Sequence, residues 1–272
     1  RDYTTQWIDA FREDAATLGL ETPEEMPRAT DEPNLQAMGE LVAALERNGH
    51  TYRRDGSTYF KIATLPQYGR LARLDRDGMR DGVSVDVDEY SKDDPRDFVL
   101  WKASRPGEPS WDVGTGPGRP GWHIECSAMA EKLLGVDFAI HGGGSDLVFP
   151  HHENEIAQSE AAGRPFARVW MHNGMVESGA EKMSKSEGNI FQLSEALDRY
   201  GRDAVVAYLI SGHYRQPLAF GPEQMQQAVA MGAYLEFVSS FANEEATIEE
   251  YATAIKEIGA EHCIVSSDRG QG

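Results

Sequence analysis

The chain has 272 residues, of which 40% are apolar, and it contains no run of about 18 apolar residues that could span a bilayer. Its 26 basic and 45 acidic residues leave a formal charge of -19 at pH 7, which argues against a nucleic-acid binder because such proteins neutralise phosphates with Lys and Arg. Two cysteines, Cys126 and Cys263, cannot form a disulfide framework, so we expect a protein of the reducing cytoplasm.

The first hundred residues combine helical and strand-like patterns. Apolar residues at helical spacing predict helices over residues 3–20 and 34–49. Segments 57–62 and 83–87 alternate polar with apolar residues, which predicts strands. We therefore expect a small β-rich section that ends around residues 97–102.

The middle of the chain has the pattern of an α/β protein. Residues 105–121 are rich in Gly and Pro, which predicts an irregular loop, and a helix is expected over 124–134. Residues 136–140 form a short strand candidate, the glycines at 142–144 predict a loop, and the next helix should begin near His151. Helix, strand, glycine loop and helix in succession are typical of α/β folds.

Further strands and helices are expected toward the end of the chain. Residues 169–176 predict a strand, and the loop 182–186 follows it. Segments 193–212 and 222–241 have the spacing of amphipathic helices, whereas the tail 243–272 differs in character and begins with an acidic run. The core residues expected in the first of these helices are Leu197, Tyr200, Val205, Tyr208 and Leu209.

The strongest chemical signal combines Cys126 with the histidines and acids of residues 151–155. On a helix, His151 and Glu155 are four residues apart and point from the same face, close enough to share one ion. Cys126 would add a thiolate, and such a donor set with an open position is typical of a zinc site that binds a substrate. His152 lies three residues before Glu155, so spacing leaves the choice of histidine open. The alternatives are a buried thiol beside a solvated acidic helix start, or a metalloprotease, whose H-E-x-x-H motif is absent.

Residues 182–186 read KMSKS and place Lys182 and Lys185 beside two hydroxyl groups. A cationic, hydroxyl-rich loop suits the charge that grows on a triphosphate during attack at the α-phosphorus. A K-x-x-K surface turn is the common alternative, but the full five-residue motif is more specific.

Residues 141–146 read HGGGSD, between an expected strand and an expected helix. Glycines let a nucleotide approach the backbone, and Asp146 can accept a hydrogen bond from a ribose hydroxyl; a simple turn is the alternative. No G-K-[ST] follows, so this is not a Walker loop. Trp122, which precedes Cys126, is a candidate for the wall of a pocket or for an ordinary core residue.

Three stretches occur in a specific order: residues 118–129, which read GRPGWHIECSAM, residues 141–158, and the KMSKS loop. Together they resemble cysteinyl-tRNA synthetase, a class I aminoacyl-tRNA synthetase, and weaker similarity covers residues 3–102 and continues to about Met231. The resemblance implies an α/β fold, a partial Rossmann-like catalytic domain with a connective insertion and a following helical segment. The implied divisions are the insertion at 1–102, the second half of the catalytic domain at 103–190, a helical stem-contact segment at 191–242 and an unassigned tail at 243–272.

The resemblance also implies roles for single residues. Cys126, His151 and Glu155 would bind one zinc ion, which holds the thiolate of the substrate cysteine and discriminates against serine. Trp122 would line the cysteine pocket. The implied reaction uses ATP, with Mg2+, to form cysteinyl-adenylate, and then transfers cysteine to tRNA-Cys. The residues implied to contact ATP or to steady its phosphates are His141, Asp146, Lys182 and Lys185, with the two lysines as the catalytic residues.

Two rival interpretations share part of this pattern. One is the ligase that joins cysteine to glucosaminyl-inositol in mycothiol synthesis, which has the same zinc and KMSKS elements and differs in its acceptor. The other is a non-catalytic zinc-binding fragment, which would not bind ATP. The unbroken string at 151–158 together with His141 favours the synthetase.

The family's first zinc cysteine and its His-Ile-Gly-His motif find no counterpart, since that tetrapeptide does not occur and the chain begins with Arg. Its N-terminal residues 1–6 have no signal-peptide pattern either. We therefore expect a truncated chain with three protein ligands for zinc instead of four. Such a chain should not catalyse aminoacylation alone at a useful rate, and cysteine-dependent pyrophosphate exchange by the purified chain would contradict this expectation.

Overall fold

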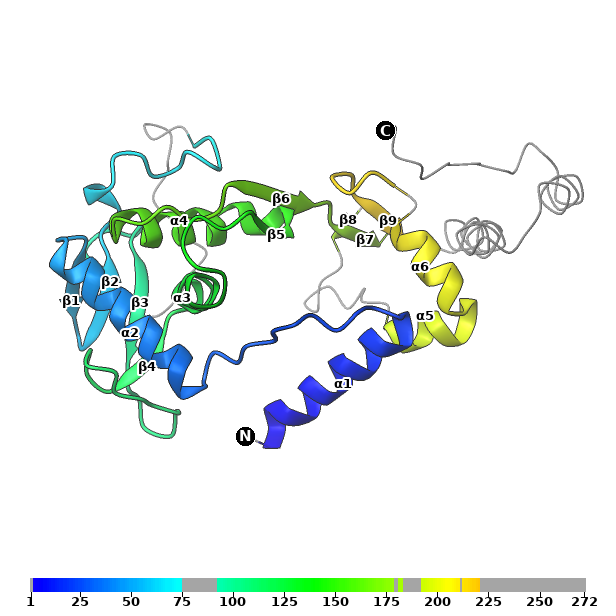
Figure 1. Cartoon of the computed structure of the whole chain (residues 1–272), viewed down its shortest axis with the longest axis horizontal. Coiled ribbons are helices and arrows are strands. Elements are labelled where there is room, and N and C mark those ends of the chain that lie inside the picture. Colours follow the sequence, from blue (N-terminus) through cyan, green and yellow to red (C-terminus); the bar gives the residue numbers. More distant parts are fainter. Residues whose placement is uncertain (1, 75–91, 179–180, 183–191, 211, 221–272) are drawn as a thin grey trace, which may run out of the picture. The chain divides into compact units, whose positions relative to one another are not determined.

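The computed structural model of the chain describes residues 2–74, 92–178, 181–182, 192–210 and 212–220 (Figure 1). The chain divides into two compact units, one of residues 24–173 and one of residues 1–23 with 174–272. Each unit combines helices with β-strands, so the expected α/β class is confirmed. No helix in the described ranges is long and apolar enough to cross a membrane.

A four-stranded antiparallel sheet forms one side of unit 24–173. Its strands are β1 (Thr51–Arg54), β2 (Ser57–Phe60), β3 (Phe98–Ala103) and β4 (Gly118–Pro120), in the order β1-β2-β3-β4. Asp55 and Gly56 join β1 to β2 with positive φ angles of 50° and 78°, as a two-residue hairpin turn requires. Strand β4 lies within the stretch 105–121 that was expected to be irregular, and it pairs with β3 despite its Gly and Pro residues.

Three helices pack with this sheet around one core. They are α2 (Glu32–Arg47), α3 (Trp122–Leu134) and α4 (His151–Ala161), and the short 3-10 turn η1 (Ile62–Thr64) adds to the same core. The buried side chains come from these three helices, from η1 and from strands β2 and β3, and the largest fully buried ones are Met38, Leu41, Leu45, Phe60, Phe98, Leu100, Trp101 and Ile124. Because α3 and α4 share this core, burial of apolar surface fixes one helix relative to the other.

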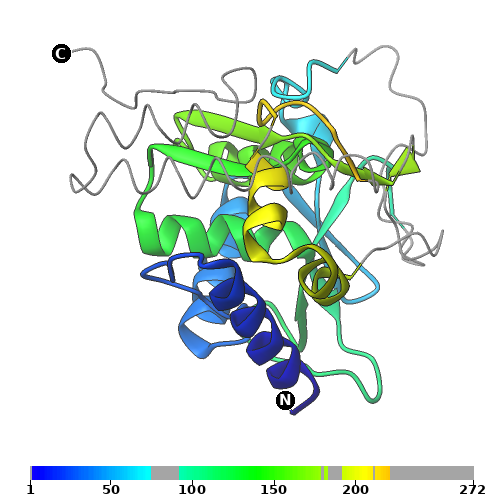
Figure 2. The same cartoon turned by 90° about the vertical axis from the view of Figure 1, so that its right-hand side faces the viewer.

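Strands β5 (Ile140–Gly144) and β6 (Val169–Asn173) pair with each other in parallel (Figure 2). In the order of the chain, the 3-10 turn η2 (Ser145–Val148) and helix α4 lie between these two strands. The prediction of a strand at 136–140 with a glycine loop at 142–144 was wrong, since the glycines lie inside β5. Glycine is normally disfavoured in strands, but here a Cβ atom on Gly143 would lie 2.9 Å from Cε1 of His152. The absence of a side chain at Gly143 lets a histidine ring lie directly on the strand.

The second unit has a smaller core. It contains α1 (Asp2–Leu18), α5 (Leu193–Tyr200), α6 (Arg202–Ile210) and the strands β7 (Val176–Ser178), β8 (Glu181–Lys182) and β9 (Leu218–Phe220), in the sheet order β8-β7-β9. Its buried residues Ala196, Val205, Ala207 and Tyr208 pack with Leu18, Leu197 and Tyr200 at the edge.

Three sequence predictions need correction in or next to this unit. The single helix expected over 193–212 is broken at Gly201, whose φ of 80° is outside the helical range. Leu209 is 41% exposed and is not a core residue. The strand expected over 169–176 is two strands, β6 and β7. The predictions for 83–87, 222–241 and the tail 243–272 lie outside the described residues.

Gly121 sets the start of α3. Its amide donates a hydrogen bond to the Leu100 carbonyl at 2.8 Å, and a Cβ atom at this position would lie 2.2 Å from the Val99 carbonyl oxygen. We expect Gly121→Ala to lower the free energy of unfolding by about 1–3 kcal/mol, because the backbone of β3 cannot yield cheaply. Urea unfolding measures this loss.

Gly212→Ala is the matched control, because the nearest atom to a Cβ there is Leu218 Cδ2 at an ordinary 3.5 Å. It should change the free energy of unfolding by no more than about 0.5 kcal/mol. Equal stability of the Gly121 variant and the wild type would contradict the proposed close packing of β3 against the start of α3.

Candidate metal centre

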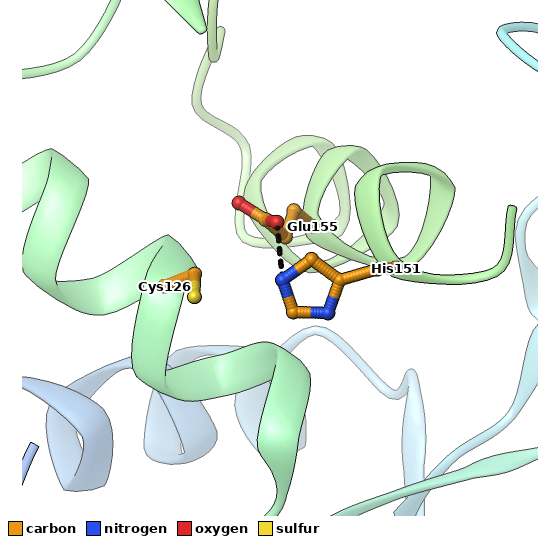
Figure 3. Close-up of side chains that lie close together, drawn as sticks. All are labelled: Cys126, His151 and Glu155. Carbon is orange, nitrogen blue, oxygen red and sulfur yellow. Dashed lines mark ion pairs between the residues drawn. The ribbon is translucent and has the colours of Figure 1, made fainter. Parts of the chain in front are cut away.

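Cys126, His151 and Glu155 meet between α3 and α4, and Figure 3 shows their side chains pointing toward one another. The candidate ligand atoms of these three residues all lie within 4.8 Å of one another. Nε2 of His151 is 2.9 Å from Oε1 of Glu155, one helical turn further along α4. Helical spacing thus accounts for the His–Glu pair, whereas the thiol arrives through the packing of α3 on α4.

Glu155 is a fully buried carboxylate. Within the described part of the chain, neither of its oxygens accepts a well-aligned hydrogen bond, although Nε2 of His141 lies 3.1 Å from Oε2. Burial raises the pKa of Glu155, but the nearby His141 and His151 lower it by more, so the pKa is below its ordinary value and the group is ionised. A buried anion without aligned donors is costly, and a bound cation would remove that cost.

Cys126 is partly buried on the neighbouring helix. Burial, together with the charges of Glu155 and Glu125, raises the pKa of its thiol to about 12. The thiol is therefore protonated and unreactive while no cation is near. A coordinating metal ion reverses this balance, because it deprotonates a thiol that binds it.

His151 is oriented by a second histidine. Nδ1 of His123 and Nδ1 of His151 are 2.8 Å apart, so one ring donates a hydrogen bond and the other accepts it. Burial and the neighbouring His151 lower the pKa of His123 to about 3, which keeps its ring neutral. The indole ring of Trp122, which is 53% exposed, lies 4.6 Å from the His151 ring. This contact leaves Nε2 of His151 directed at Glu155.

His152, the alternative histidine left open by spacing, is oriented in a similar way. Its Nδ1 lies 2.8 Å from Nε2 of His172 on β6, and burial lowers its pKa to about 4. Its own Nε2 lies 4.0 Å from Oε1 of Glu155, further than Nε2 of His151. The structure thus brings both histidines to the carboxylate, with His151 the nearer.

Sequence reasoning did not identify His123 or His172 as site residues. His123 is three residues before Cys126 on one helical turn, a spacing that could have suggested it. No local pattern points to His172, because it reaches His152 only through the pairing of β6 with β5.

The remaining predicted site residues lie in different places. His141 is on β5, where its ring packs against Trp170 with 4.9 Å between ring centroids. Asp146 is exposed on η2, and Lys182 ends the short strand β8. Lys185 lies outside the described residues. The roles proposed for these four residues toward ATP stay predictions.

Two other residues of the same helical run have structural partners. The carboxylate of Glu153 accepts hydrogen bonds from the amides of Gly69 at 2.7 Å and Ala72 at 2.9 Å. Asn154 Oδ1 accepts a hydrogen bond from the hydroxyl of Tyr68 at 2.6 Å. Glu153 and Asn154 therefore anchor the segment at 68–72, while Glu155 faces the thiol.

The comparisons with known proteins show the family to which the chain belongs. Residues 1–230 match the family described as tRNA synthetases class I (C) catalytic domain. The chain belongs to this family. The resemblance inferred from the motifs is thereby confirmed at the level of the family.

Curated relatives of this class I synthetase chain include two cysteine–tRNA ligases. That of Pelobacter propionicus is 50% identical over 236 residues, which cover 84% of this chain and 47% of the relative. That of Methylococcus capsulatus is 48% identical over 229 residues, which cover 84% of this chain and 49% of the relative. The chain thus spans about half the length of the curated relatives it matches.

A solved class I synthetase has a similar fold. Mycobacterium tuberculosis methionyl-tRNA synthetase in complex with methionyl-adenylate superposes with a TM-score of 0.59, covering 84% of this chain and 55% of that chain. The sequence identity is 16%, so the likeness concerns the fold alone. It confirms the expected class I catalytic fold.

Glu153 and Glu155 allow a matched test, because both are buried acids on one helix. Glu155→Gln should weaken the binding of a divalent metal ion at least about tenfold, since it removes the only carboxylate of the ligand set. Glu153→Gln should lower the free energy of unfolding by about 1–3 kcal/mol, because a charged acceptor for two amides is lost. Metal content by mass spectrometry and urea unfolding of the metal-free protein measure the two effects.

The two effects should separate cleanly between these variants. Glu153→Gln, once folded, should keep the metal content of the wild type. An equal loss of metal in both variants would mean that Glu155 acts on the site only through the general packing of α4.

Proposed function

We propose that the chain is the part of a cysteine–tRNA ligase that selects cysteine and supports its activation by ATP. The observation that carries the proposal is the convergence of a thiol, an imidazole and an ionised, buried carboxylate on one point. The curated relatives at 48–50% identity, which are cysteine–tRNA ligases, support it independently. They also favour tRNA over an amino sugar as the acceptor.

The described residues fit a zinc ion. Ligand atoms around a tetrahedral zinc ion are about 3.3–3.6 Å apart, given bonds of about 2.0–2.3 Å. The candidate ligand atoms of Cys126, His151 and Glu155 lie within 4.8 Å of one another, with 2.9 Å between the imidazole and the carboxylate. Small side-chain rotations therefore suffice. When bound, zinc would supply a soft Lewis acid with a vacant position for the substrate thiolate.

The chain's own residues orient this site. His123 holds the ring of His151 through their Nδ1 atoms, so that Nε2 is presented at the centre. Trp122 packs against the same ring and remains half exposed, so its indole is proposed to line the pocket for the side chain of the substrate cysteine. A pocket wall alone separates cysteine from serine poorly, so selection would rest on the preference of a soft ion for sulfur.

Activation would follow at the carboxyl end of the bound cysteine. A carboxylate oxygen attacks the α-phosphorus of ATP, pyrophosphate leaves with Mg2+, and cysteinyl-adenylate forms. Lys182 and Lys185 are proposed to steady the phosphates during this step, and His141 and Asp146 to contact the nucleotide. A terminal ribose hydroxyl of tRNA-Cys then attacks the acyl carbon, and AMP leaves. The proposed divisions assign the insertion to 1–102, this chemistry to 103–190 and the stem contact to 191–242.

The selection step can be tested with the cobalt-substituted chain. A thiolate bound to Co2+ gives a charge-transfer absorption in the near ultraviolet, and L-cysteine should increase it because a second sulfur joins the ion. L-serine and L-alanine at equal concentration should leave the spectrum unchanged. The readout is absorbance, so it needs no catalytic activity.

Variants locate the site in the same experiment. Cys126→Ser should remove the protein's own charge-transfer band, whereas Cys263→Ser is the matched control and should keep it. A spectral change with serine as large as that with cysteine would refute selection through the metal. A band that depends on Cys263 would refute the assignment of the ligand.

A further inference from the structure

Gln158 is a fully buried residue of α4 to which the proposed function gives no role. It lies one helical turn beyond Glu155, and none of its side chain is exposed. Within the described ranges, Nε2 of Gln158 has no hydrogen-bond partner. A buried N–H group without an acceptor is costly, so native structures rarely keep one unless it has a use.

The position of Gln158 on the helix directs its side chain toward the candidate metal centre. Because residues 151, 155 and 158 are spaced by four and by three, His151, Glu155 and Gln158 lie on one face of α4. A helical side chain leans toward the N-terminus of its helix and covers the turn before its own Cα atom. The side chain of Gln158 therefore leans toward the turn that carries Glu155.

Ser127 determines which end of the Gln158 amide is free. This buried serine follows Cys126 on α3, and its hydroxyl donates a hydrogen bond to Oε1 of Gln158 at 2.5 Å. The carbonyl oxygen of His123, at 3.3 Å, is a poorer acceptor for the same proton. Since Oε1 is held by a residue of α3, the two N–H bonds of Nε2 are left for a different acceptor.

Glu155 offers the acceptor that Gln158 lacks. Its two oxygens are buried and accept no well-aligned hydrogen bond in the described part of the chain. A donor without an acceptor and an acceptor without a donor thus lie one turn apart on the same face of α4. Side chains three residues apart on a helix are neighbours, so rotation of these two side chains can join them.

We propose that Gln158 is a positioning residue of the metal centre, and that its Nε2 donates a hydrogen bond to the carboxylate of Glu155. The inference rests on the proposed function, in which Glu155 binds the ion. Donors around a ligating carboxylate fix its orientation and the number of oxygens that it gives to the ion. With Gln158 in place, Glu155 binds through one oxygen, and one position stays free for the thiolate of the substrate cysteine.

The test compares two variants that break the same hydrogen bond. Gln158→Met and Ser127→Ala both remove the contact between the two side chains, but only Gln158→Met removes the donor to Glu155. Gln158→Met should weaken the binding of Co2+ to the metal-free full chain at least about tenfold, as the loss of a partner of a ligand does. Ser127→Ala should weaken it by a much smaller factor. Titration with Co2+ against a competing chelator measures both affinities.

The cobalt spectrum separates positioning from general packing. The visible bands of Co2+ change in intensity with the number of ligand atoms, so Gln158→Met should alter them and keep the near-ultraviolet band of the Cys126 thiolate. Gln36→Met is the matched control, because Gln36 is exposed on α2, where its Nε2 lies 3.4 Å from Oε1 of Glu40. It should keep the affinity and both bands. Urea unfolding of each metal-free variant checks that it is folded.

Equal cobalt affinities of Gln158→Met and Ser127→Ala would overturn the inference, since both variants would then act through packing alone. A crystal structure of the cobalt-loaded wild type is a second measurement that needs no variant. A distance above about 3.5 Å from Nε2 of Gln158 to both oxygens of Glu155 would overturn the inference there.

Failure of the proposed function can be told apart from failure of this inference. A wild type that binds no cobalt would overturn both together. A thiolate band that does not respond to cysteine would overturn the proposed function alone, because the affinities of the two variants would still report on Gln158.

Discussion

The packing of α3 against α4 is the contact on which the site depends. Ile124 and Ala128 of α3 and Ala157 and Ala161 of α4 belong to one buried core, and this core sets the distance from Cys126 to Glu155. The burial of apolar side chains between the two helices therefore determines where Cys126 and Glu155 lie. The same burial excludes water from the Glu155 carboxylate, which makes it a strong ligand for a cation and a costly group without one.

Residues 151–155 serve two purposes because a helix turns by about 100° per residue. His151 and Glu155 face the thiol of Cys126, while Glu153 faces the amides of Gly69 and Ala72. Glu153 and Glu155, which are two residues apart, therefore have different partners. Glu153 accepts hydrogen bonds from two backbone amides, whereas Glu155 faces imidazole nitrogens and is the carboxylate that we propose as a metal ligand.

The sequence predicts the candidate ligands that the structure brings together, but it does not predict their surroundings. The four-residue spacing of His151 and Glu155 is a local property of a helix, and Cys126 was a candidate because a thiolate completes a zinc donor set. His172 reaches the site through the register of β6 on β5, a long-range property without a local signal. The glycines at 142–144 suggested a loop because strand propensity disfavours them, but packing of the His152 ring on Gly143 requires glycine within the strand. Gly201 and the helix break it causes were missed for the opposite reason, since the apolar spacing continues across it.

The acidic residues on the surface and the buried Glu155 differ in how strongly they attract a cation. A formal charge of -19 attracts cations weakly everywhere, because exposed carboxylates are hydrated and screened by salt within about 10 Å. Glu155 is fully buried, and its closest neighbours are the imidazoles of His141 and His151, whose Nε2 atoms lie 3.1 Å and 2.9 Å from its two oxygens. A thiol, imidazoles and an ionised carboxylate gathered in one buried place are a donor set that suits a transition-metal ion. The preference for a metal ion that we propose for this site would therefore come from the buried environment of a single acid and not from the abundance of acids elsewhere.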